Sequence, residues 1–127
     1  MNLSAGRLFV AINALVGLVV GASLLVVPST ILAILGIEVD PSGSALAQLY
    51  GAELVGFNVA TWMYRHPPFV RPIVIGHVVN ESLTATVLVL GAIGGLGNAF
   101  VWLFAVVAAT FAIGFGWLAI QPSGASE

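Results

Sequence analysis

The sequence predicts an all-α fold: a transmembrane antiparallel four-helix bundle, formed by residues 1–127 as a single integral membrane domain. Hydrophobic residues make up 60% of the chain and charged residues only 6%, and the mean hydropathy is +1.13, which is far from the composition of a water-soluble domain. The apolar residues also form four segments of about 20 residues, the length that an α-helix needs to cross a hydrocarbon core of ~30 Å. Helices are expected because backbone groups in lipid must be paired within the segment.

The four segments are separated by proline-rich and glycine-rich breaks. The expected spans are residues 8–27, 45–64, 72–92 and 99–120. The first segment follows a single arginine, as in a secretory signal peptide, but it is longer than the apolar region of about 7 to 15 residues typical of such peptides. It is therefore interpreted as a retained span.

Residues 28–44, "PSTILAILGIEVDPSGS", connect the first two spans. Their apolar centre is too short to cross a bilayer, so a brief helix lying at the membrane interface is expected, with Ser29 or Thr30 as its N-cap. The carboxylates of Glu38 and Asp40 should face water. This segment is the one short interfacial element of the predicted bundle.

All three fixed cations fall on one side of this arrangement. Arg7 precedes the first span, and Arg65 and Arg71 flank the turn between the second and third spans. Because cytoplasmic loops carry an excess of arginine and lysine, both termini are expected in the cytoplasm. Three arginines form no basic patch, so nucleic acid is excluded as a partner.

Small residues at four-residue spacing predict close helix contacts. Gly17 and Gly21 form a GxxxG pattern in the first span, and Gly56 lies between Ala52 and Ala60 in the second. Such positions let two helix backbones approach closely in lipid. The contact expected from Gly17 and Gly21 is either within the chain or with another subunit.

Polar residues interrupt the third span in the stretch "GHVVNESLTAT", residues 76–86. At ~100° per residue, His77, Asn80 and Glu81 share one face of that helix. Counting inward from the helix ends places further polar groups at a similar depth on other spans. The predicted polar layer comprises Asn13, Glu53, Asn58, His77, Asn80 and Glu81.

Several roles are open to this layer. The six side chains could be structural hydrogen-bonding groups between helices, or a pocket for the polar head of a quinone, a tetrapyrrole pigment or a lipid. A charge at mid-membrane costs at least ~2.5 kcal/mol, so ionisable residues there mark functional sites by default, and proton transfer through Glu53, His77 and Glu81 is a further role. No metal site and no catalytic residue is assigned, because HxxxE without a second histidine is common on helices. The absence of cysteine excludes thiolate and iron–sulfur chemistry.

The first half of the chain resembles a known family. An arginine, the run "GLVVGASLLVVPSTILAILGI" and then "LAQLYGAELVGFNVATWMYR" are similar to the small four-helix proteins of the DoxX-like group, over about the first 65 residues. The resemblance implies a bundle fold in a bacterial cytoplasmic (inner) membrane and an accessory role beside a larger partner. It assigns no catalytic residue, and the lack of cysteine argues against direct sulfur chemistry.

Two functions are expected on these grounds. The first is a non-catalytic accessory subunit of a larger membrane protein complex, with membrane lipids and partner helices around it. The alternative is a binder of a lipophilic small molecule at the layer of Glu53, His77 and Glu81. An enzyme in its own right is the least favoured class.

Overall fold

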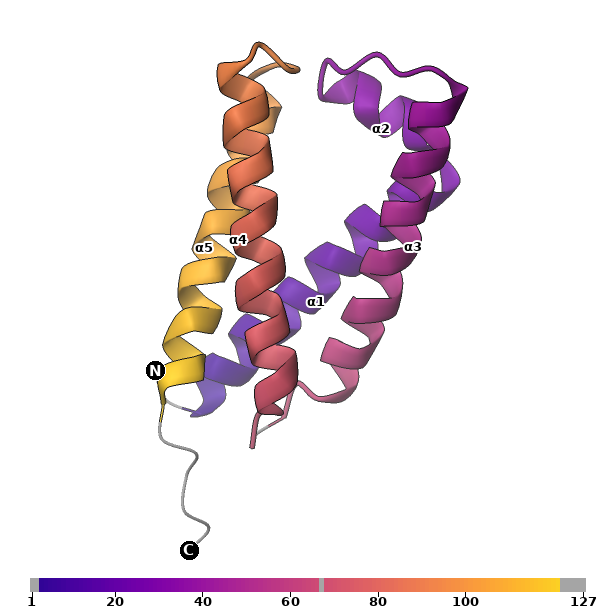
Figure 1. Cartoon of the computed structure of the whole chain (residues 1–127). Helices are drawn as coiled ribbons and strands as arrows, with labels where there is room; N and C mark the ends of the chain where they lie inside the picture. The colour runs from indigo at the N-terminus through magenta and orange to yellow at the C-terminus, as the bar shows by residue number, and fades with distance from the viewer. Residues whose placement is uncertain (1–2, 67, 122–127) are drawn as a thin grey trace, which may run out of the picture.

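The computed structural model describes residues 3–66 and 68–121, and their regular structure is entirely α-helical (Figure 1). The all-α prediction is therefore confirmed. The five helices are α1 (Leu3–Val26), α2 (Pro28–Ile34), α3 (Pro41–Met63), α4 (Arg71–Ile93) and α5 (Ala99–Ile120). The four long helices correspond to the four expected spans, although α1 and α3 begin earlier than expected.

Three of the long helices are long and apolar enough to cross a membrane. They are α1 from Ser4, α4 and α5. The 23-residue α3 has the same length as α4 but is not among them, because residues such as Gln48, Glu53 and Asn58 lower its hydropathy. Three of the four expected spans are therefore long and apolar enough to cross a membrane.

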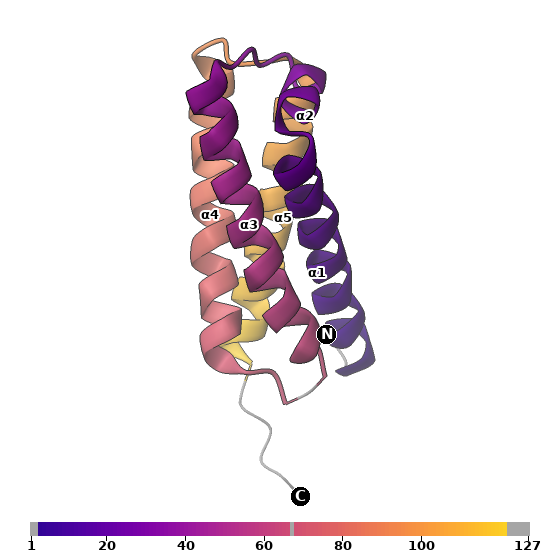
Figure 2. The same ribbon diagram turned by 90° about the vertical axis from the view of Figure 1, so that its right-hand side faces the viewer.

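The long helices are arranged as two pairs, α1 with α3 and α4 with α5. Figure 1 shows that the pairs lie close together near the two chain termini and diverge toward α2, with α1 running obliquely behind. Figure 2 shows all four helices running along the length of the molecule. The space between the pairs is the feature that positions the candidate site.

Backbone contact between glycines holds the first pair together. A Cβ atom added to Gly21 would lie 2.9 Å from the Gly51 carbonyl oxygen, and one added to Gly51 would lie 2.7 Å from the Gly21 carbonyl oxygen. Gly17 faces the Asn58 carboxamide, which occupies the space of its missing side chain. Gly56 makes no such contact within the described part of the chain, because nothing lies within 4 Å of a Cβ at that position. Gly51 and Gly56 are about 140° apart on a helix turning ~100° per residue, so only one can face α1.

A hydrophobic core joins the pairs at the end where they converge. Val10, Val74, Phe111 and Phe115 are buried there. The ring of Phe9 on α1 packs edge-on against Phe115 on α5, with 5.1 Å between the centroids. This core fixes the start of α1 against α4 and α5.

The short helix α2 starts one residue before the polar residues expected to cap it. Its N-cap is Val27, which makes no side-chain cap, and Pro28 occupies the first turn. The prediction of Ser29 or Thr30 as N-cap is therefore wrong. Proline at this position needs no cap for its own nitrogen and has a φ angle already suited to a helix. The Ser29 hydroxyl instead lies 3.3 Å from that of Ser44.

Asn98 ties the two helix pairs together at their diverging end. Its backbone N–H donates to the Leu35 carbonyl and its Nδ2 to the Ile34 carbonyl, both at 2.9 Å, while its Oδ1 caps α5 by accepting from the Phe100 N–H. Gly97 lies beside Leu35 with φ +70°, a conformation that L side chains rarely adopt. We refer to these hydrogen bonds as the Asn98 clasp. The pairs are thus joined at both ends, by the clasp at one and by the hydrophobic core at the other.

Candidate ligand site between the helix pairs

His77 on α4 is the centre of the polar residues in the interior. Its side chain is 1% exposed and lies between two phenyl rings, Phe115 at 4.2 Å and Phe57 at 4.4 Å between centroids. Its Nε2 is 2.7 Å from the hydroxyl oxygen of the fully buried Thr61 on α3. The imidazole therefore joins the two helix pairs through one hydrogen bond and one ring contact, to Thr61 and Phe57 on α3, while Phe115 on α5 contacts it within its own pair.

Glu81, one turn further along α4, makes the link to α1. Its Oε1 accepts a 2.9 Å hydrogen bond from Asn13 Nδ2. The same oxygen is 3.8 Å from His77 Nδ1, which is too long for a hydrogen bond but close enough for an ion pair. Asn13, Thr61, His77 and Glu81 together form what we call the polar cluster, and it connects α1, α3 and α4.

The hydrogen bonds constrain the protons of the polar cluster. The Thr61 hydroxyl has one proton, and it lies 3.0 Å from the Phe57 carbonyl oxygen. When that proton is donated to Phe57, His77 Nε2 must donate to Thr61, and its Nδ1 then faces Glu81 Oε1. One additional proton, on His77 Nδ1 or on the Glu81 carboxyl group, makes the contact between these two side chains attractive. The pair is then an imidazolium with a carboxylate or an imidazole with a carboxylic acid, and both forms have no net charge.

A crevice of about 80 Å³ lies beside the polar cluster, with walls from all four long helices. A water molecule requires about 10–15 Å³ of such volume, so the crevice has room for several waters or a small head group. Pockets that hold a whole ligand typically have a volume of about 300–1,000 Å³, so a longer molecule would extend out of this crevice. The polar part of the lining comprises Asn13, Tyr50, Asn58, Asn80, Glu81 and Thr84. The apolar part comprises Val16, Gly17, Val20, Leu54, Phe104, Val107 and Phe111.

Two buried carboxamide groups in the lining are only half satisfied. Asn13 and Asn58 are each 3% exposed. The Nδ2 of Asn13 donates to Glu81, and that of Asn58 donates to the Leu54 carbonyl at 2.8 Å. The Oδ1 atoms of both, like His77 Nδ1, have no hydrogen-bond partner in the part of the chain that the structure describes. Buried polar atoms without partners are rare and costly, so these oxygens indicate a missing donor.

The structure brings together five of the six residues expected in one layer. Asn13, His77 and Glu81 join the polar cluster, and Asn58 and Asn80 line the crevice.

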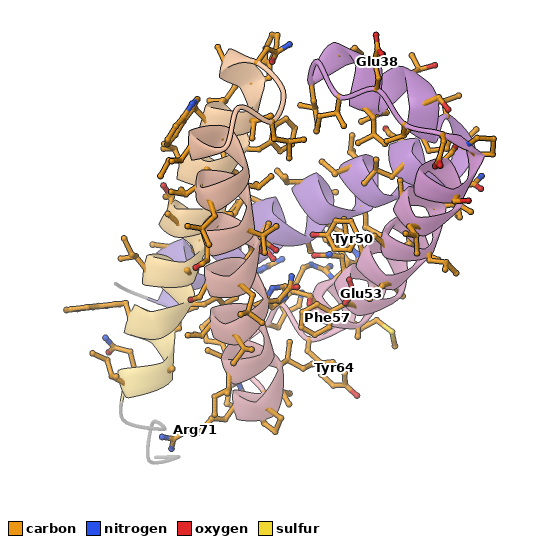
Figure 3. All side chains as sticks on the ribbon, turned by 45° about the horizontal axis from the view of Figure 1, so that its top comes forward. Glu38, Tyr50, Glu53, Phe57, Tyr64 and Arg71 are labelled. Atoms are coloured by element: carbon orange, nitrogen blue, oxygen red, sulfur yellow. The ribbon has the colours of Figure 1, made fainter. Side chains whose placement is uncertain are left out.

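Glu53 is the one residue of the expected polar layer that the structure does not bring to the crevice. Figure 3 shows it between Tyr50 and Phe57 along α3, but its side chain is exposed and does not line the crevice. It lies 40–60° round the helix from those two residues at ~100° per residue, which turns it from the crevice to the rim.

Two site residues were missed by sequence reasoning. In sequence, Thr61 cannot be distinguished from the many threonines in membrane helices whose hydroxyl bonds only to a carbonyl of the same helix. In the structure its hydroxyl does bond to the Phe57 carbonyl, but it also bonds to His77 on α4. Tyr50 fits an interfacial aromatic belt, yet its ring borders the crevice and its hydroxyl interacts with the Thr84 side chain on α4. The polar face of α4, which Thr84 shares with His77 and Glu81, was the available signal for Tyr50. No comparable signal marked Thr61.

Metal ligands are sparse around the site. Among residues 3–66 and 68–121, no three histidine, cysteine, aspartate or glutamate side chains lie close enough together to hold a metal ion. The polar cluster supplies only His77 and Glu81.

No protein-family model, curated protein or solved structure matches this chain. The chemistry of the crevice therefore rests on its own residues.

Proposed function

We propose that this chain is a small integral membrane protein that binds a lipophilic molecule, such as a quinone, a pigment or a lipid, by its polar head. The supporting observation is that Asn13 and Asn58, two residues that line the crevice, each have a buried carboxamide oxygen without a partner in the described part of the chain. A bound head group that reaches these atoms would remove the cost of leaving them unpaired. The role is one of binding, with no catalytic residue assigned.

The surroundings of the crevice favour an apolar tail. Beyond the polar residues, its lining is aliphatic and aromatic. Exposed aliphatic side chains continue over the outer faces of the helices, including Val19, Leu83 and Val106. A tail that leaves the crevice would therefore lie among lipid chains and apolar side chains, where burial is favourable.

The membrane arrangement is part of the proposal. We place all four long helices, α3 included, across a bacterial inner membrane as an antiparallel bundle with both termini cytoplasmic. In support, Arg7 and Arg65 both lie near His66 at the end that carries the termini and the α3–α4 connection (Figure 1). Cysteines introduced singly at Ser42 and Gln121 should react with an impermeant thiol reagent from opposite sides of intact vesicles. Reaction from the same side would contradict the arrangement.

Retention of a ligand can be measured on protein extracted in mild detergent. Organic extraction and mass spectrometry should find one lipophilic molecule per chain. Val20→Trp should abolish its retention because the indole would fill the crevice, which Val20 lines. The matched control is Val19→Trp, at the neighbouring residue, whose side chain is 65% exposed. This variant should retain the ligand. Equal retention in both variants, or no stoichiometric molecule in the unmodified protein, would contradict the proposal.

A second function, that of accessory subunit in a larger membrane complex, is favoured by Glu53. An exposed carboxyl group in the middle of a membrane helix is costly in lipid and is stabilised by a polar neighbour. The resemblance to DoxX-like proteins points in the same direction. A photo-crosslinking residue at Gly56, one turn from Glu53, should capture a specific protein in intact membranes, whereas one at Val19 should not. Capture of lipid alone from both positions would contradict this role.

A further inference from the structure

We propose that the head group bound in the crevice is a neutral hydrogen-bond donor, so that the ligand is a lipophilic alcohol or phenol and not a ketone, ester or ether. This inference rests on the proposed function and deepens it. It follows from which hydrogen-bonding groups in the lining are already used and which are free.

The donors of the two buried carboxamides are already used. Asn13 Nδ2 is committed to Glu81 Oε1, and Asn58 Nδ2 to the Leu54 carbonyl oxygen. What remains at each residue is an acceptor, Oδ1, without a partner. A carbonyl-headed ligand would bring a further acceptor to these oxygens, whereas a hydroxyl brings the proton they lack.

Turning the carboxamides over does not supply the missing donor. A flipped Asn58 would place its oxygen against the Leu54 carbonyl, and a flipped Asn13 would place its oxygen against Glu81 Oε1. With Glu81 as a carboxylate, both arrangements exchange a hydrogen bond for a contact between two acceptors. The present orientations are therefore the ones that the neighbouring atoms favour.

Glu81 adds an acceptor that reaches the crevice. Its side chain is 14% exposed and lines the crevice, and the hydrogen bond from Asn13 uses only one carboxyl oxygen, Oε1. The other lining residues do not select between donors and acceptors, because the hydroxyls of Tyr50 and Thr84 and the carboxamide of Asn80 can act as either. The balance of the lining thus favours a donor.

The proximity of His77 to Glu81 argues for a neutral donor over a cationic one. An ammonium head would be attracted by an isolated carboxylate, but Glu81 Oε1 lies 3.8 Å from His77 Nδ1. With a proton on both ring nitrogens, His77 forms an imidazolium–carboxylate pair with Glu81, which carries no net charge and leaves the Glu81 oxygens as acceptors. A cation in the crevice would then be buried without a counter-charge.

Three photoreactive probes with the same alkyl chain and a diazirine in the tail test the inference. They differ only in the head: a primary alcohol, its methyl ether and the corresponding amine. Each is crosslinked to the purified full-length protein in lipid nanodiscs, and labelled residues are mapped by mass spectrometry. Unlabelled alcohol should displace the probes from the crevice at a concentration about two- to tenfold lower than the ether, the ratio expected for one net hydrogen bond.

Asn13→Leu and Asn58→Leu should each bring the ratio of ether to alcohol concentrations closer to one. Each replaces the carboxamide by an apolar side chain of similar size and so removes one free acceptor. Thr86→Val is the matched control, since its hydroxyl is exposed on the far face of α4 and bonds to the Ser82 carbonyl. If the leucine variants do not fold, the comparison of heads on the unmodified protein still decides the matter.

Each outcome has one meaning. Crevice labelling with equal displacement by alcohol and ether, or with the amine as the strongest competitor, would overturn the neutral-donor inference and leave the binding function standing. Failure of all three probes to label the crevice would overturn both.

Discussion

Asn13 on α1 donates a 2.9 Å hydrogen bond to Glu81 on α4, a residue 68 positions later in the chain. The two helices belong to different pairs and make few other contacts. The bond is therefore a main connection between the pairs at mid-height. It also holds Glu81 Oε1 close to His77, so the position of one carboxyl group depends on helices from both halves of the molecule.

Asn13→Leu, Glu81→Leu and the double variant should form a thermodynamic cycle with a coupling energy of about 0.6–1.7 kcal/mol, the range found for hydrogen bonds between membrane helices. The measurement is thermal unfolding in detergent. The corresponding cycle for His77 and Glu81 should give a smaller coupling, because their 3.8 Å separation exceeds a hydrogen bond. A larger coupling for His77 than for Asn13 would show that the ion pair, and not the carboxamide, positions Glu81.

Thr61→Val should lower the free energy of unfolding by about 1–3 kcal/mol, because it leaves His77 Nε2 buried without a partner. Thr110→Val is the control. The Thr110 hydroxyl bonds only to the Val106 carbonyl on an exposed face, so its loss should cost less than about 0.5 kcal/mol. Equal effects of the two substitutions would show that the Thr61 hydroxyl does not support the imidazole.

Gly21→Ala should separate α1 from α3 and destabilise the protein by about 1–3 kcal/mol, because the new methyl group meets the Gly51 backbone. Gly56→Ala should be neutral or stabilising by up to about 1 kcal/mol, since alanine favours helix and nothing lies nearby. Chemical crosslinking of the two variants in membranes provides a second readout. If Gly56→Ala instead weakens the protein or removes a crosslinked species, Gly56 packs against another subunit.

The His66 imidazole should titrate below its usual midpoint of 6.5. Loss of hydration, followed by the positive charges of Arg7 and Arg65, lowers its pKa. The folded state then binds a proton less readily than the unfolded state, so this residue leaves stability unchanged well above pH 6.5 and opposes folding as the pH falls below that value. An NMR titration of the His66 ring in Arg7→Gln should show a higher midpoint than in the unmodified protein. An unchanged midpoint would contradict the role of Arg7.

Composition and segment length carried most of the fold prediction. The uninterrupted apolar segments predicted the helix boundaries closely, as in residues 99–120. Each segment can be judged by itself, because a helix that crosses a bilayer needs about 20 consecutive apolar residues whatever its neighbours are. The starts of α1 and α3 were less predictable, since helices extend past the hydrocarbon core wherever local caps allow. Asp40, which accepts from the Gly43 N–H at 2.7 Å, is such a cap.

The site was predictable in composition but not in geometry. Helical periodicity placed His77 and Glu81 on one face correctly, because both lie on one rigid helix. It could not show that Glu53 faces outward, since the rotation of α3 is set by the contact of Gly21 with Gly51, between two helices. The same rotation brings Thr61 toward His77. Depth in a membrane can be counted from a sequence, whereas helix rotation depends on the neighbour.

The grouping of the helices into pairs also bears on the order of assembly. α1 and α3 are complete once residue 63 has been synthesised, and their close backbone contact requires nothing from α4 or α5. The second pair is likewise local in sequence, so each half can associate as it leaves the ribosome, before the long-range connections form. The polar cluster and the Asn98 clasp would then form last, as two preassembled hairpins dock. Two separately expressed fragments, divided in the connection between α3 and α4, should accordingly recombine in the membrane.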